Sequence, residues 1–358
     1  MIFAGFAKPL LFGGVLALLS ACLTWLMLRA GIMYVPNQRS SHARPVANGG
    51  GVAIIAAFFV GYGVLYALGE DHVAERHMVG FALAALGIAA VSFADDLGRI
   101  RTFVLKLIAQ VLAACILVAF GIVFRHLSLP WVGAIDLGPW GYPLTVIWVV
   151  ALTNIVNFMD GLDGLAAGTC AIAALFLGFV TYAEGSLFVY LFCYVLAAAT
   201  LGFLVFNFPR ARIFMGDVGS QFLGFVFAAL AVIAAEHDAS RTSFLVVPLL
   251  FFHFIFDTAF TMTRRALNGE NIAQAHRSHL YQLLNQCGWS HAQVSLLHFA
   301  MTAAQGFGAL TLIRLGPDRR ALVFLPFLGV EIVYALLVMR AAKRRGLLPP
   351  LAAQSRIT

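Results

Sequence analysis

Two adjacent carboxylates, Asp95 and Asp96, stand at the end of an apolar segment of the sequence. Adjacent carboxylates repel each other and are costly to remove from water. Because successive side chains on a helix lie about 100° apart, we expect the two aspartates to face different partners. A divalent cation or a basic side chain such as Lys106 would relieve the repulsion, and one carboxylate could then act as a base. The alternative interpretation is a solvated helix cap.

A second group of polar side chains lies between two apolar segments. Four amides and carboxylates recur there at every third position: Asn154, Asn157, Asp160 and Asp163. Gly161 and Gly164 predict that the helix breaks within this stretch and opens its backbone to a ligand. Amides and carboxylates in such a break can bind ribose hydroxyls or the edge of a base. The alternative is a polar loop in which Asp163 caps the following helix.

A further carboxylate, Asp217, stands at the start of another apolar segment, after a polar run that begins at Asn207. An acid just inside such a segment is a functional candidate by default. Mg²⁺ binds one or two carboxylates together with substrate phosphates. With Asp95 and Asp96, Asp217 supplies enough negative charge for one Mg²⁺ that bridges a diphosphate, and Mn²⁺ is an alternative. A simple cap is the other interpretation of Asp217.

The late polar stretch 276–279 combines histidine and arginine side chains. Arg277 can clamp a phosphate, and His279 can donate a hydrogen bond to one. Upstream, Asp257 lies inside an apolar segment, and we expect it to pair with one of two arginines about two turns later, Arg264 or Arg265. Glu331 also lies inside an apolar segment, and the sequence gives it no assignment.

Apolar helices are the elements that must position these residues. The sequence is 61% hydrophobic and 11% charged, whereas soluble domains carry about 25% charged residues. A helix that crosses a bilayer needs about 20 apolar residues. We therefore predict an all-α polytopic membrane protein, a single integral membrane domain over 1–358, with about eleven spans: 10–33, 49–68, 78–94, 104–124, 143–157, 163–183, 186–206, 213–235, 243–263, 293–315 and 320–341.

The distribution of charge orients these spans. Most Lys and Arg residues fall on one side if the N-terminus lies outside, as the positive-inside rule requires. The polar clusters, including the stretch 37–45, fall on that same side, which places the active site at the cytoplasmic face. The net charge of +7 is then explained by topology and by attraction to anionic membrane lipid, with no nucleic acid as partner. The Gly- and Pro-containing segment 125–142 predicts an ordered external loop or hairpin.

The polar pattern resembles a known family, the polyprenyl-phosphate N-acetylhexosamine-1-phosphate transferases of the glycosyltransferase 4 type. Relatives of phospho-N-acetylmuramoyl-pentapeptide transferase belong to it. The resemblance covers about residues 34–282. Its specific part consists of two blocks: Asn154-x-x-Asn157-x-x-Asp160-Gly161-x-Asp163-Gly164-Leu165, then Asn207 with Phe214-Met215-Gly216-Asp217-x-Gly219-Ser220.

The resemblance implies a reaction and a location. A (N-acetyl)hexosamine-1-phosphate, with UDP-N-acetylglucosamine as one donor, passes from a UDP-sugar to undecaprenyl phosphate and releases UMP. The product begins lipopolysaccharide O-antigen or another surface glycan of cell-wall biogenesis, in the bacterial inner membrane. A transporter with intramembrane acids is the alternative, although transport residues should lie near mid-bilayer. The sequence leaves the oligomeric state open, a homodimer included.

The resemblance also assigns catalytic roles. Asp95 matches a residue that is either the base or the nucleophile, acting with the lipid phosphate, and Asp96 matches its acidic neighbour. Lys106 matches a basic residue at the phosphates. Asp217 matches the Mg²⁺ ligand.

Substrate contacts follow in the same way. Four side chains match contacts to the nucleotide sugar and its uridine: Asn157, Asp160, Asp163 and Asn207. Phe214 matches an aromatic ring that stacks on uracil, and Arg44 lies near an early basic residue of the family. Asn154 belongs to the same substrate-binding stretch.

The loop that contains the stretch 276–279, called the late loop below, departs from the family pattern. Arg277 and His279 align, and we expect them to contact the substrate. Tyr281 and Gln282 stand where the family commonly has histidines. The residue pattern resembles that of the branch that initiates O-antigen more than that of the muramoyl-pentapeptide branch.

Overall fold

The computed structural model describes most of the chain as a helical bundle. The described residues are 2–34, 45–68, 75–100, 102–129, 132–238, 240–271, 274 and 276–348. Arg44 and positions 37–44 of the first polar cluster lie outside them. The helices are α1 (Ile2–Arg29), α2 (Gly51–Leu68), α3 (Glu75–Asp96), α4 (Phe103–Ala119), α5 (Gly141–Phe158), α6 (Leu165–Ala183), α7 (Phe188–Asn207), α8 (Gly216–Glu236), α9 (Val246–Leu250), α10 (Phe252–Leu267), α11 (Leu280–Gln286), α12 (His291–Leu312) and α13 (Phe324–Arg344).

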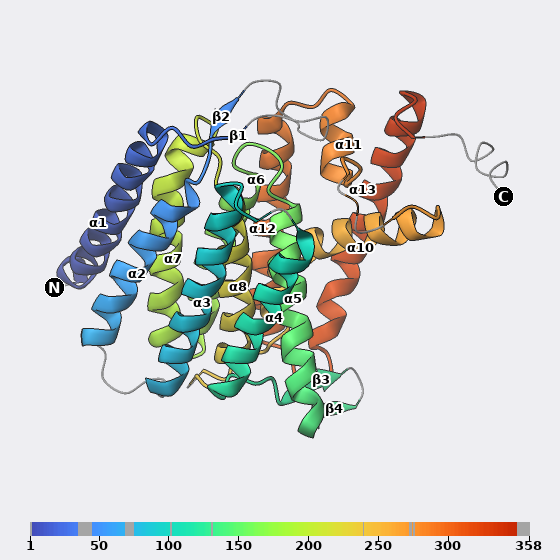
Figure 1. Cartoon of the computed structure of the whole chain (residues 1–358). Helices are drawn as coiled ribbons and strands as arrows, with labels where there is room; N and C mark the ends of the chain where they lie inside the picture. The colour runs from blue at the N-terminus through green and yellow to red at the C-terminus, as the bar shows by residue number, and fades with distance from the viewer. Residues whose placement is uncertain are drawn as a thin grey trace.

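Two short antiparallel hairpins lie at opposite ends of this bundle (Figure 1). One pairs β1 (Met33–Tyr34) with β2 (Val46–Ala47), and the other pairs β3 (His126–Leu129) with β4 (Gly133–Asp136). Two 3₁₀ turns, η1 (Gly138–Trp140) and η2 (Arg320–Val323), precede α5 and α13. The hairpin of β3 and β4 confirms the ordered structure expected within 125–142.

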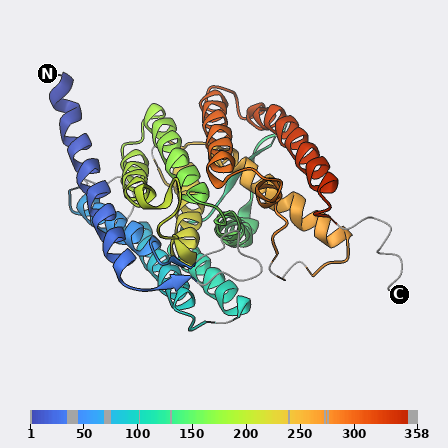
Figure 2. The same cartoon turned by 90° about the horizontal axis from the view of Figure 1, so that it is seen from above.

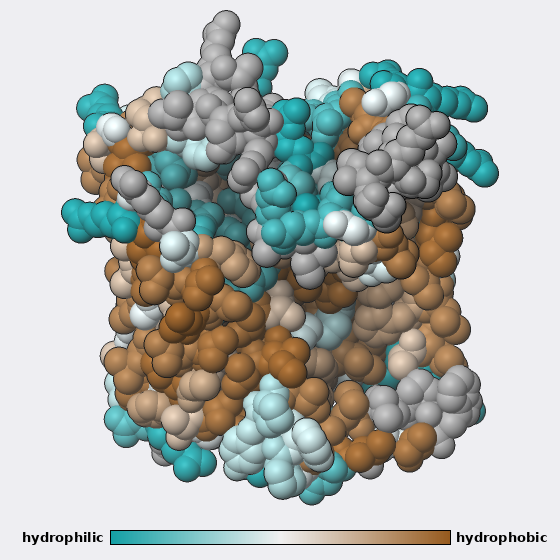
Figure 3. Space-filling view, turned by 45° about the vertical axis from the view of Figure 1, so that its right-hand side comes forward, coloured by the Kyte–Doolittle hydropathy of each residue, from teal (hydrophilic) through white to brown (hydrophobic). Residues whose placement is uncertain are grey.

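The bundle is built to cross a membrane several times. Within the described ranges, seven helical stretches are long and apolar enough to span a bilayer, and α2 and α4 are shorter apolar helices. On the face drawn in Figure 3, hydrophobic side chains form a broad band across the middle, with polar side chains towards both ends. The chain is therefore a multi-pass membrane protein, and the total of about eleven spans remains a prediction.

The expected span 243–263 is not a single helix, and this corrects the sequence prediction. Helix α9 ends at Leu250 and α10 begins at Phe252. Figures 1 and 2 show α10 lying across the direction of the other long helices. Pro248 lies in the first turn of α9, where a missing backbone N–H is tolerated, so it does not cause the break at Phe251. The polar side chains of α10 would be costly in lipid.

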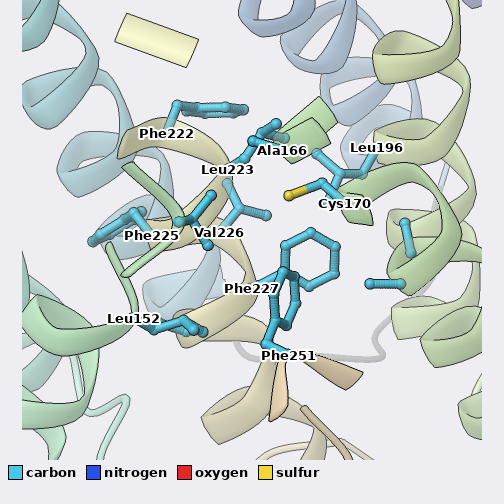
Figure 4. Packing of buried hydrophobic residues seen from close by; sticks show 14 of the residues in the cluster. Leu152, Ala166, Cys170, Leu196, Phe222, Leu223, Phe225, Val226, Phe227 and Phe251 are labelled. Carbon is cyan, nitrogen blue, oxygen red and sulfur yellow. The ribbon is translucent and has the colours of Figure 1, made fainter. Parts of the chain in front are cut away.

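Helix α8 forms the core of the bundle. Of the 18-residue apolar window within it, 94% is buried inside the protein. Figure 4 shows its phenylalanines packed among apolar side chains from neighbouring helices. The rings of Phe227 and Phe251 meet edge to face with centroids 4.8 Å apart. A helix that is apolar all round lies either in lipid or inside the protein, and α8 lies inside the protein.

The first turn of α8 packs directly on the first turn of α2, because both carry glycine there. A Cβ atom on Gly51 would lie 2.3 Å from the Cα of Gly219 and 2.4 Å from its nitrogen. Small residues allow such close approach of helix backbones in membranes. This contact fixes the end of α8 from which Asp217 projects.

We expect Gly51→Val to lower the unfolding temperature of the detergent-solubilised protein, because overpacking of this kind typically costs about 1–3 kcal/mol. The matched control is Gly63→Val in the same helix, where an added Cβ meets no atom within 4 Å. The unfolding temperatures of the two variants are measured by heating each sample and monitoring the loss of monodisperse protein. Equal unfolding temperatures for the two variants would contradict the close contact.

Candidate active site

The polar clusters meet at the end of the bundle that carries β1 and β2 (Figure 1). Asn48 donates from Nδ2 to Oδ1 of Asp96 over 3.2 Å. The backbone N–H of Phe214 donates to the carbonyl oxygen of Ala47 over 2.8 Å. Segments far apart in the sequence therefore form one polar site, as their expected placement on a single face predicts.

Lys106 joins two carboxylates at the centre of this site. Its Nζ lies 2.7 Å from Oδ2 of Asp95 and 2.7 Å from Oδ2 of Asp217. The three side chains come from the last turn of α3, the first turn of α4 and the first turn of α8. Partly buried charges are costly unless they are paired, so this contact holds three helix ends together.

Asp96 faces a different partner from Asp95, as expected for neighbours on a helix. Its two carboxylate oxygens accept hydrogen bonds from the backbone N–H groups of Asp217 and Val218, each over 3.0 Å. Gly216 has a φ of +77°, and a Cβ there would lie 2.5 Å from Oδ2 of Asp96. Asp96 therefore caps α8 and orients Asp217, through a contact that a side chain at position 216 would obstruct.

Asn157 aligns the carboxylate of Asp217 from the opposite side. Its Nδ2 donates to Oδ1 of Asp217 over 3.1 Å and to Oγ of Ser220 over 2.8 Å. With Lys106 on Oδ2, both oxygens of Asp217 are therefore held in a fixed direction. Such preorganisation is what an electrostatic catalyst requires.

Two glutamines extend this network into the bundle, and the sequence prediction gave them no role. Gln110 exchanges hydrogen bonds with Asn154 over 2.6 and 3.2 Å and donates to Gln221 over 3.1 Å. Each glutamine lies one helical turn after a charged site residue, Lys106 or Asp217. This spacing of four residues inside apolar helices was the available signal.

The chain breaks after α5 as the two glycines predict. Helix α5 ends at Phe158, and Gly164, directly before α6, has a φ of +69°. The side chain of Asn207 accepts from the backbone N–H of Gly164 over 2.9 Å and donates to the carbonyl of Ile213 over 2.9 Å. This asparagine thus joins the break to the segment that carries Phe214.

Asp163 is not the cap of the following helix, which corrects one interpretation of the sequence. Its carboxylate accepts from the backbone N–H of Ala211 over 3.0 Å and lies 3.0 Å from Nδ1 of His291. Its carbonyl oxygen accepts from Oγ of Ser295 over 2.7 Å. The sequence analysis missed His291 and Ser295, since they start an otherwise apolar helix with no motif around them.

Asp160 lies between α5 and α6, beside the other acids. Burial and the nearby carboxylates of Asp217 and Asp96 raise the pKa of Asp160 from 3.8 to about 8. A neutral Asp160 can donate a hydrogen bond, whereas an ionised one would attract a cation. Four of the carboxylates at this end of the bundle therefore form one electrostatic group: Asp95, Asp96, Asp160 and Asp217.

Two aromatic rings lie beside this polar group. Phe214 and Tyr34 meet edge to face with centroids 5.6 Å apart. Phe214 stands directly before the α8 cap, and Tyr34 lies in β1. The sequence prediction included Phe214 as a ring for base stacking and did not include Tyr34.

The acid that was expected to pair with arginine contacts the late loop instead. Asp257 does not pair with Arg264 or Arg265: its Oδ1 lies 3.0 Å from Nδ1 of His279. Arg264 and Arg265 bind backbone carbonyls of the loop instead. Arg277 lies in the same loop, where its carbonyl accepts from the side chain of Gln286 over 2.8 Å.

The donor atoms of the site suit a hard cation with phosphate ligands. Across the described part of the chain, no group of three or more His, Cys, Asp or Glu side chains is arranged to hold a metal by itself. Carboxylates of Asp95 and Asp217 nevertheless converge on one point, at Nζ of Lys106. Mg²⁺ needs only one or two carboxylates when substrate phosphates and water complete its coordination. The residues present fit such an ion.

Comparison with known proteins places the chain in a family. The profile of glycosyl transferase family 4 matches residues 78–235. An undecaprenyl-phosphate N-acetylglucosaminyl 1-phosphate transferase of Bacillus subtilis, described as probable, is 31% identical over 80% of this chain and 78% of its own length. A decaprenyl-phosphate N-acetylglucosaminephosphotransferase of Mycolicibacterium smegmatis is 32% identical over 87% of this chain and 82% of its own. The chain belongs to glycosyl transferase family 4.

A second branch of relatives matches a shorter part of the chain. A phospho-N-acetylmuramoyl-pentapeptide-transferase of Lactiplantibacillus plantarum is 33% identical over 55% of this chain and 60% of its own length. Membership of glycosyl transferase family 4 makes the chain a phosphotransferase enzyme of the membrane. The transporter alternative receives no support from these comparisons.

The raised pKa of Asp160 predicts a pH-dependent stability. The folded state keeps a proton that the unfolded chain loses above about pH 4, so the free energy of unfolding falls as the pH rises towards about 8. Asp160→Asn removes this proton. Between about pH 5 and pH 8, we expect the unfolding temperature of the chelator-treated wild type to fall more than that of the variant.

The exposed acid Asp136, which lies in β4 at the other end of the bundle, provides the control. Asp136→Asn should retain the pH dependence of the wild type. If wild type and Asp160→Asn lose stability in parallel over this range, Asp160 is ionised in the folded protein and the assignment is wrong.

Proposed function

We propose that this enzyme transfers an N-acetylhexosamine-1-phosphate from a UDP-sugar to undecaprenyl phosphate and releases UMP. The observation that carries the proposal is the convergence of Asp95 and Asp217 on Lys106 at one polar end of an apolar bundle. A water-soluble donor and a lipid acceptor can meet only at such a boundary. Both relatives described above are named for transfer of N-acetylglucosamine phosphate, so this is the first sugar to test.

The reaction is a phosphoryl transfer, in which positioning and electrostatics carry most of the catalysis. A phosphate oxygen of the lipid attacks the β-phosphorus of the UDP-sugar. The bond from the β-phosphorus to the oxygen that bridges the two phosphates breaks, and UMP leaves with that oxygen. Asp95 accepts the proton of the lipid phosphate or orients that phosphate. Lys106 then exchanges one carboxylate partner for the oxygens of the diphosphate.

Asp217, with Asp95 beside it, would hold Mg²⁺, or Mn²⁺ in its place. The ion would offset the negative charge that develops on the diphosphate during the reaction. Asn157 and Asp96 keep Asp217 in the direction that this role requires. Phe214 offers a ring for the uracil base, and Asn154, Asp160, Asp163, Asn207, Arg277 and His279 surround the remaining polar groups of the donor. Arg44 would add a further positive charge to the residues that bind the substrate.

The active site lies on the cytoplasmic side of the bacterial inner membrane in this proposal, because UDP-sugars are made there and the Lys and Arg residues favour that side. The product is a polyprenyl-diphosphate-linked sugar, which starts an O-antigen of lipopolysaccharide or another surface glycan. A homodimer is compatible with the apolar surface shown in Figure 3.

Asp217→Asn should reduce UMP release at least about 100-fold, because it removes the charge that holds the cation while retaining the shape of the side chain. Purified enzyme, UDP-N-acetylglucosamine, undecaprenyl phosphate and Mg²⁺ in detergent provide the assay. Asp318→Asn, at an exposed acid between α12 and η2, is the matched control and should retain wild-type activity. Near-normal, Mg²⁺-dependent UMP release by Asp217→Asn would refute the metal assignment.

The identity of the sugar is tested separately with a panel of UDP-sugars. Enzyme that uses N-acetylated hexosamine donors should release UMP from them and leave UDP-glucose intact. Release from UDP-glucose alone would contradict the N-acetylhexosamine assignment, while preserving the proposed reaction class.

A further inference from the structure

Asp257 is a buried acid that binds the start of α11 rather than the arginines of its own helix. Only 1% of the residue is exposed. Its carboxylate accepts from the backbone N–H of Leu280 over 2.9 Å and from that of Tyr281 over 3.0 Å. It also lies 3.0 Å from Nδ1 of His279 and accepts from the hydroxyl of Thr261. One carboxylate on α10 thus fixes both the first turn of α11 and the imidazole that precedes it.

This contact determines how His279 is presented. Because Nδ1 faces a carboxylate, it carries the hydrogen, and Nε2 is left as the second polar atom of the ring. The ring of His276 stacks on His279 with centroids 4.9 Å apart, which restricts its rotation further. A carboxylate behind a histidine is a common means of fixing the orientation of the ring.

The loop held by Asp257 forms a wall of the active site. The hydroxyl of Tyr281 donates to the carbonyl of Phe158 over 2.9 Å, at the end of α5. A Cβ on Gly161 would lie 2.2 Å from that hydroxyl, so the tyrosine packs directly on the break that contains Asp160. The His279 ring lies 6.1 Å from the Phe158 ring. Movement of α11 would therefore be transmitted to the polar break after α5.

Two arginines hold the other side of the loop through its carbonyl oxygens. Arg264 donates to the carbonyl of Ser278 over 2.6 Å. Arg265 donates to the carbonyls of Gln274 and Asn271 over 3.0 and 2.7 Å. These arginines and Asp257 all belong to α10, the helix that lies across the bundle (Figure 2). The transverse direction of α10 is what allows one helix to reach the whole loop.

We propose that Asp257 is a positioning residue for the nucleotide-sugar donor and that it acts through His279. His279 lies near Phe158, at the start of the break that contains Asp160, and imidazole and carboxylate groups suit hydroxyl groups. The sugar of the donor carries hydroxyls, whereas a polyprenyl phosphate carries none outside its phosphate. This inference rests on the proposed function and extends it to the side of the site that distinguishes one donor from another.

The test is a double-mutant cycle in the full-length enzyme with Asp257→Asn, His279→Gln and both changes together. We expect Asp257→Asn to raise the KM for UDP-N-acetylglucosamine about tenfold and to leave the KM for undecaprenyl phosphate within about twofold. Because Asp257 acts through His279, the donor KM of the double variant should be no more than about twofold higher than that of the more impaired single variant. Asp257→Glu should recover part of the loss.

Glu236 provides a matched control at the other end of the bundle. Like Asp257, it is a buried acid that accepts from two successive backbone N–H groups, those of Arg125 and His126, and contacts the Nδ1 atom of His126. Figure 1 places β3, which His126 begins, at the end opposite α11. Glu236→Gln removes the same kind of contact, so it controls for lost stability and should leave both KM values unchanged.

Hydrogen exchange separates failure of this inference from failure of the proposed function. Amides of 276–286 should exchange faster in Asp257→Asn than in wild type or Glu236→Gln, whatever the reaction. Unchanged exchange, unchanged donor KM, or independent multiplying effects of Asp257→Asn and His279→Gln would each overturn the inference. If the wild type releases no UMP from any UDP-sugar, the proposed function fails, whereas the exchange result still decides whether Asp257 positions the loop.

Discussion

The ion pairs of Lys106 with Asp95 and Asp217 are the constraint on which this end of the molecule depends. Charges that are partly withdrawn from water are stable only with partners, and loss of one partner from such a pair costs about 3–5 kcal/mol when the pair is buried. The three residues belong to α3, α4 and α8, so pairing requires three helix ends to meet. The ammonium group of Lys106 lies where two carboxylates converge. A metal cation with a bound diphosphate could take its place at this point.

The rest of the bundle serves to place α8 against these partners. Its apolar body is covered by neighbouring helices, and its first turn is fixed by Asp96 and by the close contact with Gly51. Helix α10 departs from the bundle direction and brings Asp257 to the late loop. A rigid scaffold thus carries the reacting end, while a transverse helix shapes the wall next to it.

Much of this arrangement could be predicted from the sequence, because the chemistry is concentrated in short polar stretches between apolar segments. Asp95, Lys106 and Asp217 were placed together on that basis, and the helix break after Asn157 followed from its glycines. The bend before α10 was missed, since it falls between Leu250 and Phe252 inside an apolar run that is long enough for one span. The partner of Asp257 was also missed, because hydrogen bonds to backbone amides of a distant loop leave no pattern in the sequence.

In the proposed reaction, the sugar and its phosphate move together to the lipid. The most direct measurement follows the label of UDP-N-acetylglucosamine carrying ³²P in the β-phosphate, with purified enzyme and undecaprenyl phosphate. We expect the label to enter the lipid phase in an amount equal to the UMP released. Label that remains in water as UDP, with sugar alone on the lipid, would contradict this reaction.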